Sequence, residues 1–395
     1  MATATLTRRA RPHVAPARHF INGEFVDSLS GETLDVIDPA TEETTTTTAR
    51  GRSEDMDRAV RAARDAFASG VWSRAKPGHR RQVLMRIADL IEQRGEEIHH
   101  RESLEMGRPV GQPGSPMALG MISRSAWNFR FFAMEQELAG DDAFNRDDTL
   151  LTYTVTDPAG VFGLITPWNG PFMLSTWKIG PCLAFGNSAV HKPSEWSPLS
   201  IQVLAEIMNE AGLPPGVFNI VNGLGPEAGA ALVEHPDVTG ISFTGSPGTA
   251  RDISGRAAAT LKRVSCELGG KSANIIFADA NLAQAVPAAA GLIFGNSGQS
   301  CTSGSRILVQ RPIYERFLDA LTGEAKKWPP GDPFDPATRL GPLVSRRQYD
   351  RVTGYLERAR QEGRIFHGGG RPPGLDRGFF VEPTIIVVAP YAARV

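Results

Sequence analysis

A cysteine in a loop of small residues is the first candidate for chemistry in this sequence. The segment Gly298-Gln-Ser-Cys301-Thr-Ser-Gly-Ser305 surrounds the thiol with side chains that are too small to cover it. A nucleophilic cysteine needs an accessible sulfur as well as thiolate character, and this loop provides the access. Most lone cysteines are inert packing residues, so on this motif alone both interpretations of Cys301 stay open. Cys182 and Cys266 lie in or beside apolar segments, where the inert role is expected.

A carboxylate that could act as a general base stands in the segment Cys266-Glu267-Leu-Gly-Gly270-Lys. Glu267 ends a predicted strand and precedes a flexible turn, which suits a general base and suits a surface acid equally. The histidines and glutamates within residues 96–100 lack the spacing of metal ligands and fit a solvated helix face. We therefore predict no metal site.

Two glycine-rich turns join predicted strands to predicted helices, where a dinucleotide phosphate could bind. In residues 223–229 (GLGPEAG) the last spacing is one residue longer than in the usual fingerprint, and a tight turn explains the glycines equally well. In residues 243–248 (FTGSPG) the free N–H groups at the helix start and the Ser246 hydroxyl could hold a phosphate. Helix capping by Ser246 is the other explanation.

Charged residues follow another predicted strand in the segment Lys192-Pro-Ser-Glu195. This strand ends at the carboxyl edge of the predicted sheet, where ligands bind in open parallel sheets. There Glu195 could accept hydrogen bonds from both hydroxyls of an adenosine ribose, and Lys192 could donate to the same ribose. The alternative is a solvated charged loop, since lysine and glutamate are mostly exposed in proteins.

The composition limits the class of protein. With 395 residues, 41% of them hydrophobic and 22% charged, the chain suits two packed domains of a soluble globular protein. The net charge of -1 argues against nucleic acid as a partner, because phosphate backbones are met by an excess of Lys and Arg. No apolar run is long enough to span a bilayer, so we expect no association with a membrane.

The cysteine count and the N-terminus bear on location. Three cysteines are too few for a disulfide framework and indicate a reducing compartment, so we expect a cytoplasmic location. Residues 1–19 are rich in Ala and Arg and lack acidic residues, as transit peptides do. We favour a short disordered tail over organellar targeting, because termini are often untethered.

Several elements in the first part of the chain are expected to position these residues. Residues 20–26 predict a hairpin around an Asn-Gly turn. Apolar residues at helical spacing predict helices over residues 55–67, 81–104 and 127–138, with a proline-rich break over residues 102–120. Polar residues 141–148 lead into an alternating strand over residues 151–155, which could extend from the body as an arm.

Strands and helices alternate from residue 161 onward. Strands are predicted over residues 161–166, 188–192, 217–221 and 240–244. The first helix between them begins with Ser197 as N-cap and Pro198 at the first helical position and continues to Gly212. Further helices are predicted over residues 227–234 and 248–259. This alternation predicts an α/β fold with a doubly wound parallel sheet. A second series over residues 273–310 predicts a second domain, with the boundary at residues 267–271.

Together these segments resemble the aldehyde dehydrogenase superfamily, and each falls in that family's chain order. The matching segments are residues 20–26, Pro167-Trp-Asn169, Lys192-Pro-Ser-Glu195, 243–246, 267–271 and 298–301, with 331–335, 340–343 and 380–384 extending the likeness. The likeness covers nearly everything after the N-terminal tail. One such motif is a weak signal, whereas six in order at the family's spacing are specific.

The resemblance implies an NAD-dependent, acid-forming aldehyde dehydrogenase. In that family's mechanism the thiolate, here Cys301, attacks the aldehyde, and the Asn169 amide and the Cys301 backbone N–H hold the oxyanion. After hydride transfer, Glu267 is expected to activate the water that releases the acid from the thioester. Relatives that acylate coenzyme A generally lack this glutamate, so a hydrolytic reaction is implied.

The resemblance also implies that NAD contacts the ends of several strands. The residues so implied are Thr166, Pro167, Trp168, Lys192, Ser194, Glu195, Gly225, Phe243, Gly245, Ser246 and Leu268. NAD is expected in preference to NADP, because Glu195 would repel a phosphate on the 2′ position of the adenosine ribose.

The implied architecture is a doubly wound, parallel-sheet NAD-binding domain, an α/β catalytic domain and a β arm. The NAD-binding domain is expected over residues 20–140 and 159–266, the arm over 141–158, and an incomplete catalytic domain over 267–395. A small-molecule aldehyde is the expected substrate, and the arm implies a homodimer or homotetramer.

The sequence departs from the family's pattern in three places. His191 stands where an apolar residue is usual and Ser303 where Ala is common, and neither change removes a reacting group. Relatives continue into a Glu-Glu-Ile-Phe-Gly-Pro-Val segment whose glutamate holds the nicotinamide ribose, and the sequence up to Val395 contains no such segment. If Val395 is the true terminus, we expect the chain to fold poorly by itself and to show little or no dehydrogenase activity.

A second class of function is a catalytically silent relative that binds dinucleotide or sister subunits only. Asn169, Glu267 and Cys301 are all intact, and a silent relative has no chemical need for the three together. These residues favour the enzyme.

Overall fold

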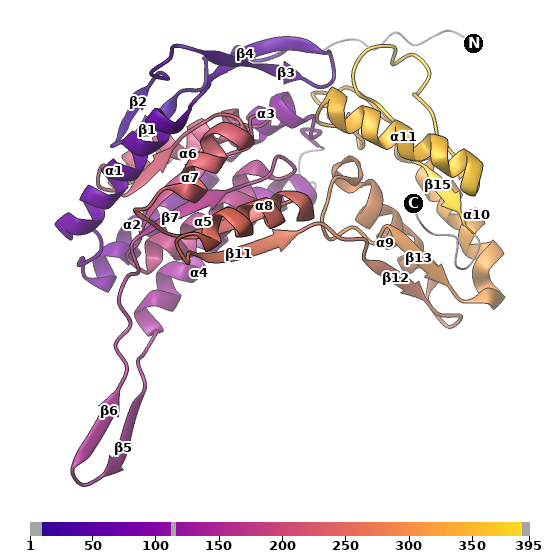
Figure 1. Cartoon of the computed structure of the whole chain (residues 1–395). Coiled ribbons are helices and arrows are strands. Elements are labelled where there is room, and N and C mark those ends of the chain that lie inside the picture. The colour runs from indigo at the N-terminus through magenta and orange to yellow at the C-terminus, as the bar shows by residue number, and fades with distance from the viewer. Residues whose placement is uncertain (1–9, 112–115, 389–395) are drawn as a thin grey trace.

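The computed structural model describes residues 10–111 and 116–388 (Figure 1). The chain up to residue 268 is built around a seven-stranded sheet, and the later elements lie beyond the carboxyl end of the edge strand that ends at residue 268. Among the described residues, no helix combines the length and the apolar character that crossing a bilayer requires.

The predicted hairpin forms one edge of the large sheet. Strands β1 (His19–Ile21) and β2 (Glu24–Val26) pair antiparallel, and the turn between them holds Asn22 at φ 54° and Gly23 at φ 83°. Positive φ at both central residues is what a tight two-residue hairpin needs, which explains the Asn-Gly pair. Phe20 then joins the hairpin to the sheet by pairing with Ile220.

The segment before the hairpin differs from the expected disordered tail. Residues 1–9 lie outside the described residues, but from residue 10 the chain is anchored. Val14 and Ala17 are buried, and Arg11 forms ion pairs at 2.7 Å with Asp38 and with Asp332. Composition did not show these contacts, because their partners lie far away in the sequence.

The predicted parallel sheet is confirmed. It contains β7 (Val161–Ile165), β8 (Ser188–Lys192), β9 (Phe218–Ile220), β10 (Val238–Gly245) and β11 (Arg263–Leu268). The spatial order is β11-β10-β7-β8-β9-β1-β2, with parallel pairing from β11 to β9. Along the chain, β8 and β9 are therefore added on one side of β7, and β10 and β11 are then added on its other side. Ligands of open α/β sheets bind beyond the carboxyl ends of the strands at such a reversal.

Helices cover both faces of this sheet, as a doubly wound fold requires. On one face the core is built with α2 (Pro77–Gln93), α4 (Pro116–Leu138), α5 (Pro171–Ala184) and α6 (Leu199–Glu210). On the other face α1 (Ser53–Ser69), α7 (Ala230–Glu234) and α8 (Pro247–Ala258) pack against a second cluster of buried side chains. A π-helical turn, η1 (Gly225–Gly229), leads into α7.

The helix predicted over residues 81–104 is two helices in the structure. Arg94 lies between α2 and α3 (Gly95–Met106) with φ −98° and ψ 16°, outside the helical region. The spacing of apolar residues continues across this break because both helices bury a face. The chain can therefore turn there without interrupting the pattern that predicts a helix.

The predicted N-cap of α6 is wrong. Pro198 occupies the N-cap position, and the buried Ser197 hydroxyl has no hydrogen-bond partner in the structure. The carboxylate of Glu105, on α3, instead accepts hydrogen bonds from the backbone N–H groups of Leu199 and Ser200. A carboxyl group at a helix N-terminus satisfies the same free N–H groups as a cap, and burial raises the pKa of Glu105 to about 8.

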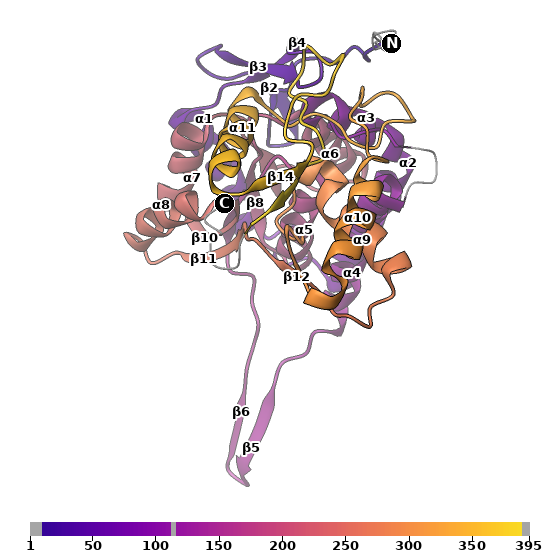
Figure 2. The ribbon, with the colours of Figure 1, turned by 90° about the vertical axis from the view of Figure 1, so that its right-hand side faces the viewer.

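The arm is a hairpin of two exposed strands, β5 (Ala143–Asp147) and β6 (Leu150–Tyr153). It projects from the body in both views (Figures 1 and 2). The first strand lies within the residues that were expected to be only a polar lead-in. Phe144, Leu151 and Tyr153 are 56%, 61% and 64% exposed, so the hairpin presents apolar side chains that its own chain does not cover.

The later elements form smaller sheets around a separate core. Strands β12 (Ala273–Ile276) and β13 (Arg306–Val309) lie within the predicted second series, and they pair parallel. The remaining elements are α9 (Leu282–Phe294), η3 (Arg311–Ile313), α10 (Tyr314–Ala325), α11 (Arg346–Glu362), β14 (Arg364–His367) and β15 (Ile385–Val387). A ribbon of β3 (Thr33–Asp38) and β4 (Glu43–Ala49) lies apart from the large sheet. The later elements bury a hydrophobic cluster of their own, which is separate from the core of the large sheet. This supports a domain boundary at residue 267, and the boundary stays a prediction.

Candidate active site

The strand ends that carry the predicted residues lie in one row. Ile165 pairs with Lys192 on one side and with Phe243 on the other, and Phe243 pairs with Cys266. The residues that follow these positions, among them Thr166 and Glu267, therefore emerge together at the carboxyl edge. The row includes β7 and β10, between which the strand order reverses, so the sheet places the predicted residues where a ligand site is expected.

The loop after β7 meets the loop that carries Cys301. The Asn169 side-chain amide donates to the Gln299 carbonyl at 2.9 Å, across 130 residues of sequence. The Asn296 side chain donates in return to the Asn169 carbonyl at 2.8 Å. The Cys301 thiol, two residues after Gln299, is exposed. Asn169 and the cysteine loop are thus brought together by direct hydrogen bonds.

The backbone before Cys301 holds an unusual conformation. Within the short turn η2 (Gly295–Gly298), Asn296 has φ 53° and Ser297 has φ 56°. Left-handed residues other than glycine each cost on the order of 1 kcal/mol or more, so contacts must hold them. The Ser297 hydroxyl donates to the Gly341 carbonyl at 2.9 Å, and the Gln299 side chain accepts from Val344 N–H at 3.0 Å. These contacts fix the loop in the conformation that leaves the thiol exposed.

Glu267 lies at the end of β11 with an exposed side chain, as does Leu268. The described part of the chain forms no hydrogen bond between Glu267 and Cys301. A buried lysine that the sequence analysis missed faces this strand. Lys178 on α5 donates to the Ser242 hydroxyl at 2.9 Å, and burial lowers its pKa to about 8 although the charges of Glu267 and Cys266 oppose that shift. A single lysine inside a helix that has no other charged residue is the signal that could have revealed it.

The segment after β8 is not a solvated loop. Lys192 is 3% exposed, and its ammonium donates to the Pro193 carbonyl at 2.7 Å and lies 3.5 Å from the Glu195 carboxylate. Burial lowers the pKa of Lys192, and the charge of Glu195 opposes this. The Ser194 hydroxyl accepts from the Trp196 N–H at 3.3 Å. Trp196 in turn lies beside Trp168, with 6.0 Å between the ring centroids.

The two glycine-rich turns have different local causes. The Ser246 hydroxyl accepts from Thr249 N–H at 3.1 Å, so it caps α8. Gly223 has φ 144°, and a Cβ there would lie 2.6 Å from the Gly51 carbonyl oxygen, so the tight turn explains this glycine. A Cβ on Gly225 would meet nothing within 4 Å. The surface at Gly225 is therefore open, which leaves room for a phosphate near the helix start.

His191 is buried in a small polar cluster under Thr166. Its Nε2 lies 2.8 Å from the Thr166 hydroxyl and 3.3 Å from the Ser175 hydroxyl, while its Nδ1 has no partner in the structure. Burial lowers the pKa of His191 to about 3, and the charges of Lys192 and Lys178 contribute to the shift. Burial therefore favours the neutral form of His191 in the folded protein.

This burial predicts a loss of stability in acid. The folded-state pKa of His191 lies below its ordinary value of 6.5, so its contribution to stability is complete above pH 6.5 and is lost as the pH falls from 6.5 toward 3. We expect His191→Leu to make the fall of the urea midpoint between pH 6.5 and 4.5 shallower than in the parent. At pH 7.5 its stability should stay within about 1 kcal/mol, because the unpaired Nδ1 is removed along with the two hydrogen bonds. His79→Gln, at an exposed histidine, is the control, and a parent-like slope for His191→Leu would contradict the prediction.

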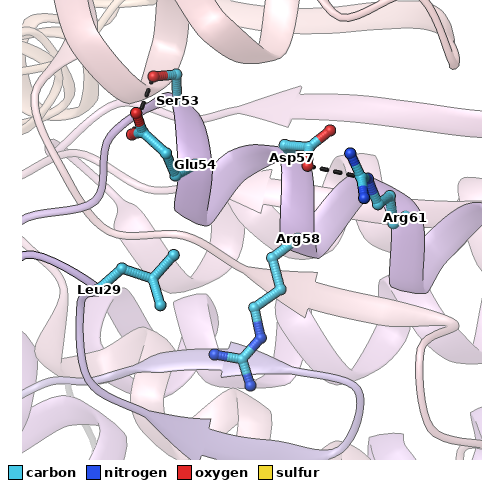
Figure 3. Close-up of a pocket in the computed structure, with 6 residues that line it drawn as sticks. All are labelled: Leu29, Ser53, Glu54, Asp57, Arg58 and Arg61. Carbon is cyan, nitrogen blue, oxygen red and sulfur yellow. Dashed lines mark hydrogen bonds and ion pairs between the residues drawn. The ribbon is translucent and has the colours of Figure 1, made fainter.

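A hollow of the surface lies elsewhere, beside α1. Figure 3 shows the residues that line it, which are Leu29, Ser53, Glu54, Asp57, Arg58 and Arg61. Ser53 donates to Glu54 at 3.0 Å, and Asp57 forms an ion pair with Arg61 at 2.9 Å. None of the predicted site residues lines this hollow. We assign it no role.

Comparison with known proteins points to one family. The sequence model of the aldehyde dehydrogenase family matches residues 25–395. Aldehyde dehydrogenase 1 of Tanacetum cinerariifolium is 42% identical over 93% of this chain and 72% of its own length. The crystal structure of HpcC from Thermus thermophilus superposes with a TM-score of 0.90 at 46% identity, over 94% of this chain and 72% of that chain. An NAD+ complex of aldehyde dehydrogenase from Bacillus cereus gives a TM-score of 0.90 at 40% identity, over 94% and 74%.

Proposed function

The chain belongs to the aldehyde dehydrogenase family, and from that premise we propose that it oxidises an aldehyde to the carboxylic acid through a thioester on Cys301. Membership makes it an oxidoreductase of aldehydes that uses NAD, as the Bacillus cereus relative solved with NAD+ does.

The first step is attack by the Cys301 thiolate on the aldehyde carbon, which forms a C–S bond and turns the carbonyl oxygen into an oxyanion. The Asn169 amide has two N–H groups, and one of them donates to the Gln299 carbonyl. The other, together with the Cys301 backbone N–H, can donate to the oxyanion. In comparable acyl-transfer reactions, each hydrogen-bond donor that is held in place before the reaction lowers the activation free energy by about 3 kcal/mol.

NAD, when bound, supplies the acceptor for the hydride that leaves the tetrahedral carbon. The carboxyl edge fits this cofactor, because Lys192 is a buried cation beside Glu195 and the surface at Gly225 is open. Lys192, Ser194 and Glu195 would hold the adenosine ribose. The other contacts would come from Thr166, Pro167, Trp168, Gly225, Phe243, Gly245, Ser246 and Leu268.

The last step is hydrolysis of the thioester. Glu267 would accept a proton from water, the hydroxide oxygen would bond to the acyl carbon, and the Cys301 sulfur would leave as thiolate. Exposure of Glu267 at the end of β11 leaves it accessible to water.

The observation that supports this proposal is the hydrogen bond from Asn169 to Gln299, because it joins the amide that we propose as oxyanion donor to the loop that carries Cys301. The test is to incubate the purified chain with a panel of short aldehydes and NAD, without coenzyme A. We expect NADH at 340 nm and an equal amount of carboxylic acid. NADH formation that requires coenzyme A, or no NADH from any aldehyde, would contradict the proposal.

NAD should be preferred over NADP. A 2′-phosphate on the adenosine ribose would approach the Glu195 carboxylate, and Lys192 is the cation already engaged beside it. We expect the ratio of kcat/KM for NAD to that for NADP to exceed about 10, and Glu195→Gln to reduce this ratio. Glu210→Gln, at an exposed glutamate on α6, should leave the ratio unchanged. A ratio in favour of NADP would mean that Glu195 does not face the ribose.

Assembly and location are further proposals. The apolar side chains of the exposed hairpin β5–β6 support a homodimer or homotetramer, which analytical ultracentrifugation would test. All three cysteines are free thiols in the structure, which supports a reducing compartment such as the cytoplasm.

A further inference from the structure

A buried ion pair connects helix α3 with the loops of the active site. Glu102, on α3, is 1% exposed, and Arg108, just after the end of that helix, is 6% exposed. Their side chains form a charge-assisted hydrogen bond. Neither residue was singled out from the sequence, and neither is a member of the site described above.

The guanidinium of Arg108 reaches both loops that form the site. Its Nη2 donates to the Asn169 carbonyl at 3.1 Å, and its Nε donates to the Asn296 side-chain oxygen at 3.3 Å. The second oxygen of Glu102 accepts from Phe172 N–H at 3.3 Å, at the start of α5. The pair thus contacts the loop after β7, the first turn of α5 and the turn before Cys301.

The contact with Asn296 falls on a strained residue. Asn296 holds φ 53°, and its side chain donates to the carbonyls of Asn169 and Gln299 at 2.8 and 3.1 Å. Arg108 donates to the oxygen of the same amide. Because both the nitrogen and the oxygen of the Asn296 amide are hydrogen-bonded, the orientation of this side chain is fixed. This orientation sets the distance between the Asn169 loop and the turn that leads to Cys301.

A contribution to stability does not account for this arrangement. Removing two charges from water is costly, and apolar residues of similar volume often stabilise a protein as well as a buried ion pair does. The planar guanidinium provides several hydrogen-bond donors in fixed directions. Arg108 uses three of them on three separate groups, which suits a role in geometry.

We propose that Arg108, held by Glu102, is a positioning residue that sets the Asn169 amide against the Cys301 sulfur. The inference rests on the proposed function, since it gives Asn169 the role of oxyanion donor. Arg108 touches neither substrate nor cofactor, and it acts through Asn169 and Asn296. Displacing a reacting group by about 1 Å can cost about 100-fold in rate, so a loss of this support should be visible in the chemistry.

Two small reagents at Cys301 separate this role from general stability. Iodoacetamide alkylates a thiolate by direct displacement of iodide, and no oxyanion forms. p-Nitrophenyl acetate acylates the thiolate through an oxyanion that collapses with loss of p-nitrophenolate, so this reaction uses the Asn169 amide. The measurement is the rate of each modification on the peptide that contains Cys301, in the purified full chain.

We expect Arg108→Met to lower the acylation rate by about tenfold or more and to leave the alkylation rate within about twofold. Arg108→Lys should restore most of the acylation, because an ammonium can still donate to Glu102 and to the Asn169 carbonyl. In the aldehyde assay Arg108→Met should lower kcat by about 10- to 100-fold with KM for NAD within about threefold. Arg80→Met is the matched control, since Arg80 is a half-buried arginine that donates to the Ala184 and Ala75 carbonyls.

Parent-like acylation in Arg108→Met would overturn the inference, and so would equal losses in acylation and alkylation. If Arg108→Met does not fold because Glu102 is left unpaired, the double variant Glu102→Gln/Arg108→Met removes both charges. It should show the same selective loss of acylation, and parent-like acylation there would also overturn the inference. A parent that reacts with both reagents but oxidises no aldehyde would contradict the proposed function and would leave this comparison valid.

Discussion

Cys301→Ala should abolish aldehyde oxidation and leave NAD binding intact. The exposed thiol beside the Asn169 loop is the group that we expect to form the covalent bond to the substrate. No other cysteine can replace it, because burial raises the pKa of Cys182 to about 12 and Cys266 packs against the core behind β11. Loss of a covalent nucleophile costs about 10⁴-fold or more in turnover in enzymes of comparable design.

The measurement is NADH formation at 340 nm with saturating aldehyde, together with NAD affinity from titration of intrinsic tryptophan fluorescence. Trp168 and Trp196 lie at the proposed cofactor site, so their emission should report binding in the parent and in the variant. Cys182→Ala is the control at a buried thiol, and its turnover per folded molecule should match the parent. Turnover of Cys301→Ala near the parent rate would remove Cys301 from the mechanism.

Glu267→Gln should slow release of the acid much more than hydride transfer. The amide has nearly the shape of the carboxylate but cannot take a proton from water, so only the hydrolytic step loses its base. General base catalysis contributes about 10²- to 10⁴-fold, and steady-state turnover should fall by that order.

Stopped-flow measurement of NADH separates the two steps. We expect a burst of about one NADH per active site at a rate close to that of hydride transfer in the parent, followed by a slow steady state. Glu210→Gln, at an exposed glutamate of α6, should behave as the parent does. Disappearance of the burst, or a steady state as fast as the parent's, would show that Glu267 is not the base of hydrolysis.

The large sheet was predictable from local patterns. Strands such as β8 and β10 are short apolar runs between helices with clear starts, and alternation of the two dictates a parallel sheet with helices on both faces. The hairpin at Asn22 and Gly23 was predictable for the same reason, because few residue pairs accept positive φ twice in succession. Each of these predictions depends on residues that are close in the sequence.

Contacts between distant segments were not predictable in this way. Ser197 looks like an N-cap by every local rule, yet the N–H groups at the start of α6 bind Glu105, 94 and 95 residues away. Arg108 likewise finds Asn169 61 residues away and Asn296 188 residues away. Such partners depend on how α3 packs in the fold, which residue type and spacing do not determine. Motif order suggested that Asn169 and Cys301 belong to one site, but the contacts that hold them there required the structure.

The most direct test of the thioester mechanism is to find the acyl group on the enzyme. Glu267→Gln is mixed with aldehyde and NAD, quenched in acid during the slow steady state, and digested for mass spectrometry. We expect the peptide containing Cys301 to gain the mass of the substrate's acyl group in place of one hydrogen, and we expect no such gain in Cys301→Ala/Glu267→Gln. An acyl group on Cys182 or Cys266, or NADH formed with no acyl-enzyme at all, would contradict this mechanism.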